Sequence, residues 1–259
     1  MPTASLAPSP SPTPTASATP VSVPSLTPTD TLTPSPSSTP TATPTLLDTQ
    51  GDILFSDGFE SGDLSAWSAA SDNGGLLNAS PQAALTGAFG IQATINSATS
   101  MYVQDDTPAS ESSYHARFYF NPNGLLPNGA ANSGFVTIFS GLNATTSTVF
   151  QVQFRRLIAG GGTYQVRLGI LRAGGNTFTT PVMISNAAHA IEIAWQSGTS
   201  ASASLYVDGV LQQTLTGLDT SAFILESIRF GPSAGLVAAS TGTLYFDAFN
   251  STRATYIGP

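Results

Sequence analysis

The sequence predicts an all-β protein: a two-sheet antiparallel jelly-roll sandwich preceded by an extended N-terminal arm of the polyproline-II type. All 24 glycines and all 23 aromatic residues lie after position 50, whereas 12 of the 19 prolines lie before position 45. Beyond position 52, short apolar runs alternate with polar residues, the period-two pattern of half-buried strands, and no window has a helical period. We therefore divide the chain into an arm, residues 1–47, and a jelly-roll domain, residues 48–259.

The arm consists mainly of proline, threonine and serine, which fill 33 of its first 45 positions. Proline fixes φ and denies the α region to the residue before it, so the six Thr-Pro steps favour polyproline II. One interpretation is a stiff linker or a mucin-like stalk that carries O-linked sugars. The candidate acceptors are the threonines of those steps: Thr13, Thr19, Thr27, Thr33, Thr39 and Thr43.

A second interpretation of the arm is that it docks on a neighbouring subunit. An extended segment can complete a foreign sheet edge or lie in a groove. The apolar residues that would serve as anchors are Val21, Val23, Leu26 and Leu32.

Thirteen short strands are expected in the domain, separated by turns rich in Gly, Asn and Asp. Their ranges are 52–56, 66–70, 89–95, 100–104, 113–120, 134–140, 148–155, 163–171, 189–196, 203–208, 210–215, 224–230 and 243–249. Several alternate cleanly, which predicts one face on the core and one toward water. Asp208-Gly209 separates two such runs and predicts a tight hairpin. This number of strands is typical of a sandwich or jelly roll.

Three segments carry a resemblance to a known family. The hairpin around Asp208-Gly209, with Leu215-Thr216-Gly217-Leu218 and Ser227-Ile228-Arg229-Phe230-Gly231, resembles the concanavalin A-like and laminin G-like jelly rolls. The stretches 54–67 and 244–249 are similar to the start and close of jelly rolls in bacterial extracellular proteins. The resemblance covers about residues 52–257 and implies the fold; the functions it allows include lectins, adhesins, glycanases and spacers.

Composition excludes several classes of partner. Only 8% of the residues are charged, there is no lysine, and the net charge is −8, which argues against nucleic acid and anionic lipid. No apolar run is long enough to span a membrane. The first residues lack the basic and apolar parts of a signal peptide. We nevertheless expect an extracellular or cell-surface protein whose leader is absent from this numbering.

Catalytic motifs are absent from the sequence. Glycanases of this fold place two or three acids on alternate positions of one strand, whereas Glu192 is alone on its strand. His115 and His189 are the only histidines, too few for a zinc site and insufficient to suggest a Ser-His-Asp set. With no cysteine and no lysine, thiolate nucleophiles, Schiff bases and a phosphate-loop lysine are excluded as well. The sequence therefore predicts that the chain is not an enzyme and has no catalytic residues.

The acidic turn at residues 57–63 suggests a metal site. In many jelly-roll carbohydrate-binding modules a structural Ca²⁺ ties the first turn to the last strand, and the resemblance places Glu60 and Asp247 in that role, with Asp57 or Asp63 as helpers. The alternative is a solvated turn held by Asx-type hydrogen bonds. Apart from calcium, no cofactor is expected.

A polar sheet face is the best candidate for binding. Arginine, glutamine and tyrosine side chains on the non-core side of three expected strands could bind sugars; the alternative is an ordinary solvated face or a subunit contact. The residues are Arg117, Tyr119, Gln151, Gln153, Arg155, Gln165 and Arg167. Trp67 and Trp195 are assigned to the core.

Taken together, the sequence favours a non-enzymatic structural or adhesive subunit outside the cell. In its sharpest form, each arm engages the next copy of the chain, and such a head-to-tail contact generates a filament. The alternatives are a carbohydrate-binding, lectin-like module of a larger secreted protein and a sandwich domain that acts as a spacer.

Overall fold

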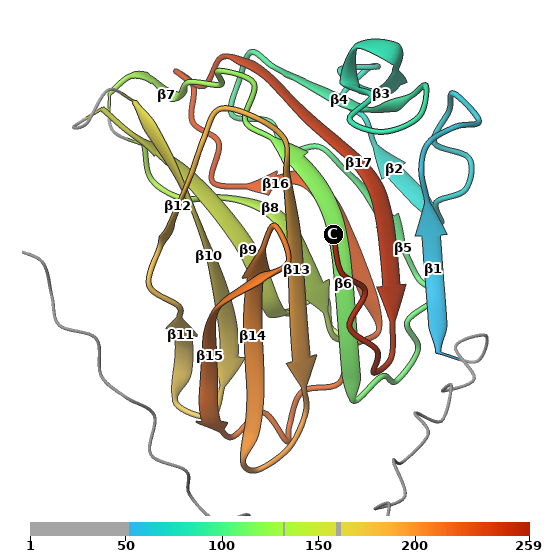
Figure 1. Ribbon diagram of the computed structural model, residues 1–259, viewed down its shortest axis with the longest axis vertical. Helices are drawn as coiled ribbons and strands as arrows, with labels where there is room; N and C mark the ends of the chain where they lie inside the picture. Colours follow the sequence, from blue (N-terminus) through green and yellow to red (C-terminus); the bar gives the residue numbers. More distant parts are fainter. Residues whose placement is uncertain (1–51, 132, 159–161) are drawn as a thin grey trace, which may run out of the picture. The chain divides into compact units, whose positions relative to one another are not determined.

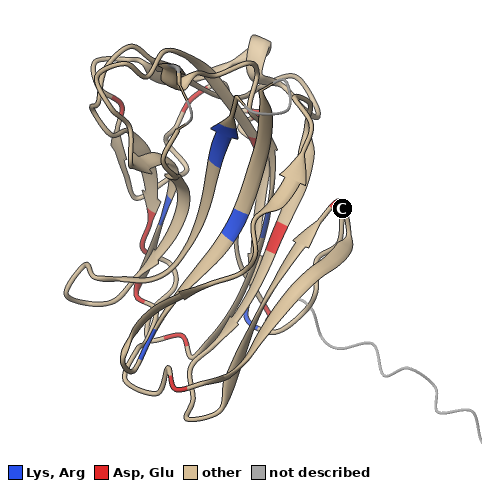
Figure 2. Cartoon of the chain, turned by 90° about the vertical axis from the view of Figure 1, so that its left-hand side faces the viewer, with Lys and Arg blue, Asp and Glu red and all other residues tan. Residues whose placement is uncertain are grey.

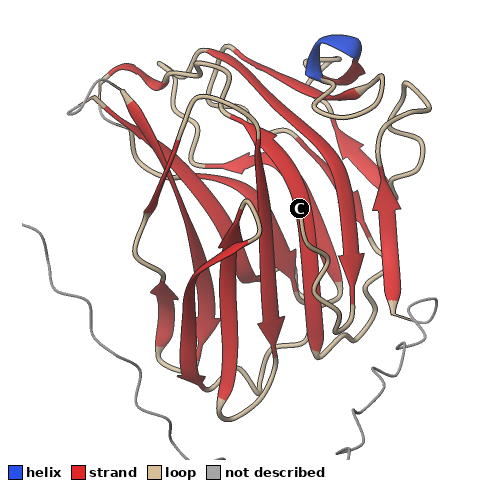
Figure 3. Ribbon diagram, viewed as in Figure 1, coloured by secondary structure: helices blue, strands red, loops and turns tan. Residues whose placement is uncertain are grey.

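A computed structural model describes residues 52–131, 133–158 and 162–259 (Figure 1). The predicted arm, with its threonine acceptors and its apolar anchors, lies outside the described residues. Within the described part, strands and their connections account for almost all of the chain, and the one helical element drawn is a short turn (Figure 3). No helix there is long and apolar enough to cross a membrane.

Two eight-stranded antiparallel sheets form a sandwich, as the sequence predicts. Sheet A runs in the order β15-β14-β13-β6-β17-β4-β3, and β1 pairs with the second half of β17. Its strands are β1 (Ile53–Asp57), β3 (Leu77–Ser80), β4 (Gly90–Ile95), β6 (Ser113–Asn121), β13 (His189–Gln196), β14 (Ala201–Val207), β15 (Val210–Leu218) and β17 (Gly242–Thr252).

Sheet B runs in the order β11-β10-β9-β8-β16-β5-β2, and β12 also pairs with β10. Its strands are β2 (Ala69–Ser71), β5 (Tyr102–Asp105), β8 (Val136–Leu142), β9 (Thr148–Leu157), β10 (Thr163–Arg172), β11 (Gly175–Phe178), β12 (Val182–Ile184) and β16 (Ser227–Ala234). The short strand β7 (Pro127–Ala130) and the 3-10 helix η2 (Pro81–Ala83) complete the described elements.

Each of the thirteen expected strands has a counterpart at nearly the expected position. Asp208 and Gly209 form the predicted hairpin turn between β14 and β15, with φ of 52° and 75°. This is the left-handed region that a two-residue hairpin requires. The strands that the sequence analysis missed, β3, β7, β11 and β12, have three or four residues each, too few to show a period.

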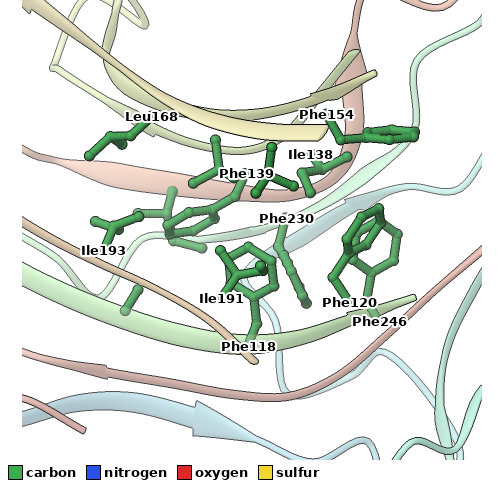
Figure 4. Close-up of a cluster of buried hydrophobic side chains, with 14 of the residues drawn as sticks. Phe118, Phe120, Ile138, Phe139, Phe154, Leu168, Ile191, Ile193, Phe230 and Phe246 are labelled. Atoms are coloured by element: carbon green, nitrogen blue, oxygen red, sulfur yellow. The ribbon is translucent and has the colours of Figure 1, made fainter. Parts of the chain in front are cut away.

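The core lies between the sheets and is built largely of phenylalanine (Figure 4). Phe230 of β16 is fully buried and has five aromatic rings with centroids 4.9–6.2 Å from its own: Trp67, Phe118, Phe139, Phe246 and Phe249. Replacing such a residue with alanine typically costs about 3–5 kcal/mol. Trp67 and Trp195 are both buried, as predicted. The inward residues of the alternating strands therefore hold the two sheets together.

Charged residues are sparse over the sandwich (Figure 2). Six of the seven arginines lie within strands β6, β9, β10 and β16; the seventh, Arg253, directly follows β17. Most of the described acidic residues lie in turns and at strand ends; the exceptions are Glu192 in the middle of β13 and Asp247 in the middle of β17. Positive charge is thus concentrated on the sheets, although the chain as a whole is acidic.

Candidate functional site

The polar residues predicted to share one face lie on opposite sides of the sandwich. Arg117 and Tyr119 belong to β6 of sheet A, whereas the glutamines and the other two arginines belong to β9 and β10 of sheet B. Because the sheets pack by their inner faces, the outer faces point away from each other. The prediction of one combined face is therefore wrong: alternation shows which side of a strand is polar but not which sheet the strand joins.

The five residues on sheet B form two neighbouring hydrogen-bonded groups, Arg155 with Gln165 and Arg167 with Gln153 and Gln151. Arg155 Nε donates to Gln165 Oε1 at 2.9 Å, and Arg167 Nε donates to Gln153 Oε1 at 2.9 Å. Gln153 Nε2 in turn donates to Gln151 Oε1 at 3.1 Å. The strand register places Gln165 opposite Arg155 and Arg167 opposite Gln153. Each bond thus joins directly opposite side chains or neighbours two positions apart on one face.

Two aromatic rings complete these groups. The Arg167 guanidinium lies 3.5 Å from the ring centroid of Phe135 and 3.9 Å from that of Phe178. Arg155 lies 4.5 Å from the Phe135 centroid. A guanidinium over an aromatic face is held by cation–π attraction, which limits the orientations of a long side chain. We call the set Arg155, Arg167, Gln151, Gln153, Gln165, Phe135 and Phe178 the sheet B platform.

The platform is positively charged and has no counter-ion among the described residues. Strands β8–β12 contain Arg155, Arg156, Arg167 and Arg172 but no acidic residue, and none of the four forms an ion pair with the described part of the chain. Partial burial lowers the pKa of Arg167, and the neighbouring charge of Arg155 lowers it further. An anion placed here would relieve that repulsion.

On sheet A, Arg117 lies at a pocket of about 480 Å³ that also contains Asp57, Glu60 and Asn250. Its guanidinium donates to Ala248 O at 3.1 Å and lies 5.2 Å from the Tyr119 ring centroid. Arg117 Nε and Asn250 Oδ1 are buried without a hydrogen-bond partner in the described part of the chain. Acidic and basic groups thus share this pocket, in contrast to the sheet B platform.

Residues 253–259 lie against the outer face of sheet A. Glu192, only 3% exposed, accepts the N–H of Ile257 at 2.8 Å and of Gly258 at 2.9 Å. The Tyr256 ring packs on Tyr206 of β14 with centroids 5.0 Å apart. Glu192 therefore has a structural role in this arrangement, because its carboxylate holds the last residues of the described chain.

The carboxylates expected to bind calcium hold backbone and side-chain donors instead. Asp247, fully buried, accepts the N–H groups of Leu85, Thr86 and Ala248 at 2.6–2.8 Å, and burial raises its pKa. Glu60 accepts the N–H of Ala88 at 3.0 Å. Both oxygens of each carboxylate are thus already occupied by N–H donors and are not free to coordinate a cation.

The two helper residues are engaged in the same way. Asp57 accepts from Phe59 N and Trp67 Nε1, both at 2.8 Å, and burial raises its pKa. Asp63 accepts from Ser61 and Ser65, and these bonds lower its pKa. Within the described ranges, no three His, Cys, Asp or Glu residues are grouped closely enough to share a metal. The residues as arranged do not fit a calcium ion, and the calcium site stays a prediction that melts with calcium and with chelator would test.

Comparisons with known proteins identify the fold alone. No family model and no curated protein matches the chain in sequence. Among solved structures, it is similar to a carbohydrate esterase from the Shiga toxin-encoding bacteriophage phi24B, with 15% identity, TM-score 0.55 and coverage of 78% of this chain and 99% of that one. It is also similar to an endo-β-1,4-glucuronan lyase from the fungus Trichoderma reesei, with 9% identity, TM-score 0.54 and coverage of 78% of this chain and 96% of that one.

Toxin domains share the sandwich as well. The binding domain of Paraclostridial Mosquitocidal Protein 1 matches with 13% identity and TM-score 0.52, over 80% of this chain and 50% of that one. The chain likewise spans 43% of the botulinum neurotoxin type G receptor binding domain. The β-sandwich implied by the resemblance is thus confirmed at the level of fold; membership of the concanavalin A-like or laminin G-like families stays a prediction.

These neighbours correct the prediction that the chain is not an enzyme. That prediction rested on the missing pair of acids, which is the signature of glycanases. An esterase and a lyase have the same sandwich fold, so this fold also supports reactions for which the pair of acids is not the signature. Absence of that pair therefore gives no ground for excluding catalysis.

Proposed function

We propose that this protein binds an acidic polysaccharide, one with carboxylate groups along its chain, on the sheet B platform. The observation that carries the proposal is the pair Arg155 and Arg167, two adjacent guanidinium groups without an acidic partner in the described residues of a chain whose net charge is −8. Arginine matches a carboxylate with two parallel hydrogen bonds, and such charge-assisted bonds are about twice as strong as neutral ones.

The neighbours of the two arginines suit a sugar chain. Gln151, Gln153 and Gln165 present amides that can donate to and accept from hydroxyl groups. Phe135 and Phe178 hold Arg167 between them, so little side-chain freedom is lost when a ligand binds. The platform is therefore prepared for an anionic, hydroxyl-rich ligand before the ligand arrives.

Names of structures with this fold agree with the ligand class. One is a glucuronan lyase, and another is an alginate lyase in complex with an alginate tetrasaccharide, at 9% identity and TM-score 0.51. Both polymers are built of uronic acids. Because such polysaccharides lie outside cells, we also propose an extracellular or cell-surface location for this protein. Filament formation depends on the arm, outside the described residues, and stays a prediction.

Binding to immobilised alginate and to an uncharged glucan tests the proposal. We expect binding to alginate alone, weakening as salt rises because the attraction is electrostatic. Arg167→Gln should weaken it about 10-fold or more, since a hydrogen bond to a charged group contributes about 1.5–3 kcal/mol. Arg172→Gln is the matched control: Arg172 lies on the same strand but donates to Ala173 O at 3.0 Å, away from the platform. Equal binding of both polymers, or equal loss in both variants, would contradict the proposal.

A further inference from the structure

Three side chains that the sequence analysis left unconnected meet where β13 begins and β14 ends. Ser185 directly follows β12, His189 is the first residue of β13, and Asp208 opens the β14–β15 turn. Ser185 Oγ lies 2.9 Å from His189 Nε2, and His189 Nδ1 lies 2.7 Å from Asp208 Oδ2. A hydroxyl, an imidazole and a carboxylate therefore form a continuous chain of hydrogen bonds.

The backbone fixes which imidazole nitrogen carries the proton. The Ser185 N–H, which can only donate, points to His189 Nε2 at 3.1 Å, so Nε2 is the acceptor. Nδ1 then carries the hydrogen and donates it to Asp208. This is the tautomer that a general base requires, with its N–H toward the orienting acid and its one free lone pair shared between the N–H and the hydroxyl of Ser185.

Asp208 is itself held in place. Its Oδ1 accepts the Ala190 N–H at 2.9 Å, and its own N–H donates to Ala190 O at 2.8 Å. The carbonyl oxygen of the following residue, Gly209, accepts a hydrogen bond from the Tyr256 hydroxyl at 3.1 Å. The carboxylate that orients His189 thus stands on a turn fixed from both sides, although 54% of its side chain is exposed.

We propose that Ser185, His189 and Asp208 are a nucleophile, base and orienting acid that hydrolyse carboxylic esters. Ser185 Oγ attacks the ester carbonyl carbon while its proton passes to His189 Nε2. The alkoxide leaves with that proton, and an acyl group stays on Oγ. A water then attacks the acyl carbon, gives its proton to Nε2 and releases the carboxylic acid, and the proton returns to Oγ.

A donor for the oxyanion is available beside the nucleophile. The backbone N–H of Asn186 follows Ser185 in an exposed loop and makes no hydrogen bond within the described part of the chain. The residue after the nucleophile supplies such a donor in other serine hydrolases. Asn186 thus offers one donor to the oxyanion without any other residue having to move.

The position of the triad indicates its substrate. Ser185 is exposed, and neither pocket on sheet A is lined by any of the three residues, so the site suits a small acyl group on a large, accessible molecule. Ser185 lies two residues beyond Met183, whose Sδ accepts from Gln165 of the platform at 3.2 Å. This assignment rests on the proposed function. The substrates of the triad would be O-acyl esters of the acidic polysaccharide, because a polysaccharide bound on the sheet B platform would pass this sheet edge.

Hydrolysis of 4-nitrophenyl acetate by the full chain tests the triad without any polysaccharide. We expect turnover above the uncatalysed rate, lost about 100-fold or more in Ser185→Ala and His189→Ala and reduced strongly in Asp208→Asn. Ser204→Ala is the matched control, because Ser204 is a half-buried serine of the adjacent β14 whose hydroxyl bonds to that of Thr214. Melting temperatures establish that every variant is folded.

A second readout separates catalysis from a merely structural network. A fluorophosphonate should label Ser185, its Oγ displacing fluoride from phosphorus, and mass spectrometry should find the label on that serine and not on Ser204. Turnover equal to the uncatalysed rate together with no label, or undiminished turnover in Ser185→Ala, would overturn the proposal.

The polymer measurement distinguishes this inference from the proposed function. Deacetylation of acetylated alginate should fall in Arg167→Gln, while that variant keeps its activity on 4-nitrophenyl acetate. Triad activity on the small ester with no binding of alginate would refute the platform and the polymer assignment and leave the hydrolase standing. Alginate binding without labelling or turnover would refute the hydrolase alone.

Discussion

The two outer faces of the sandwich are built from the same alternating pattern, yet their charged residues have different surroundings. On sheet A, residues 253–259 lie over the face, Glu192 is buried, and Arg117 shares its pocket with Asp57 and Glu60. On sheet B, no acidic residue of the described part of the chain forms an ion pair with Arg155 or Arg167. The Glu192 carboxylate has its hydrogen-bond donors within the chain and stabilises the fold, whereas two guanidinium groups with no acid paired to them in the described residues are available to an anionic ligand.

The sharpest way to break this comparison is to remove both arginines of the platform. Arg155→Gln with Arg167→Gln should weaken alginate binding more than 100-fold, since two charge-assisted contacts of about 1.5–3 kcal/mol each are lost. Arg117→Gln on the opposite face should leave binding unchanged, with melting temperatures confirming that both proteins fold. Titration calorimetry measures the constants, and a comparable loss in Arg117→Gln would show that sheet A binds instead.

Glu192 provides the converse test, a change that should affect stability and not binding. Glu192→Ala leaves the N–H groups of Ile257 and Gly258 without their acceptor and empties a buried position on β13. We expect the free energy of unfolding in urea to fall by about 2–3 kcal/mol. Alginate affinity should be that of the wild type; a parallel loss of affinity would mean that the two faces are coupled.

The aromatic neighbours of Arg167 should matter less than its charge. Phe178→Ala removes one of the two rings that hold the guanidinium and leaves Phe135 in place. Because a cation–π contact at a partly exposed site contributes about 0.5–1 kcal/mol, the dissociation constant for alginate should rise about 2–5-fold. Phe223→Ala is a suitable control, since Phe223 is a similarly half-buried ring away from the platform. No change in Phe178→Ala would show that the arginine is positioned without it.

The smallest effect expected is a pH dependence confined to the sheet A side. Burial raises the pKa of Asp247 above that of the unfolded chain, so its contribution to stability is full below the unfolded value near 3.8 and is lost as pH rises through the folded value. Asp247→Asn does not titrate. Its stability deficit against the wild type should therefore shrink between pH 3 and pH 7 in urea titrations; a deficit that grows would contradict the assigned direction.

The sequence correctly predicted the features that depend on residues close together along the chain, such as the side of a strand on which a residue lies. Alternation on β9 and β10 placed Gln153 and Arg155 outward correctly, because the period of two fixes the side of a strand. It could not place Arg117, since β6 joins β13 and β17, and strand order in a sandwich depends on pairings between distant segments. Phe178 was missed because β11 has four residues and no alternation.

The triad shows the same limit more strongly. His189 and Asp208 are 19 positions apart and meet only because β13 and β14 pair. Asp208-Gly209 was read correctly as a turn, and its aspartate was explained by that role alone. A search for histidines that directly precede a strand, with an Asp-Gly turn in the next hairpin, could have suggested the pair; Ser185 has no signal of its own among the many serines of this chain.

The placement of the arginines also decides how the chain will respond to trypsin, which cleaves after lysine or arginine. With no lysine and with six arginines in strands, the native domain offers trypsin the bond after Arg253, whose side chain is 47% exposed, and the bond after Arg172, where β10 ends. Residues 1–116 contain neither cleavage residue. Limited digestion should therefore cut after Arg253 and separate residues 254–259 from the sandwich, which uncovers the part of sheet A that they contact.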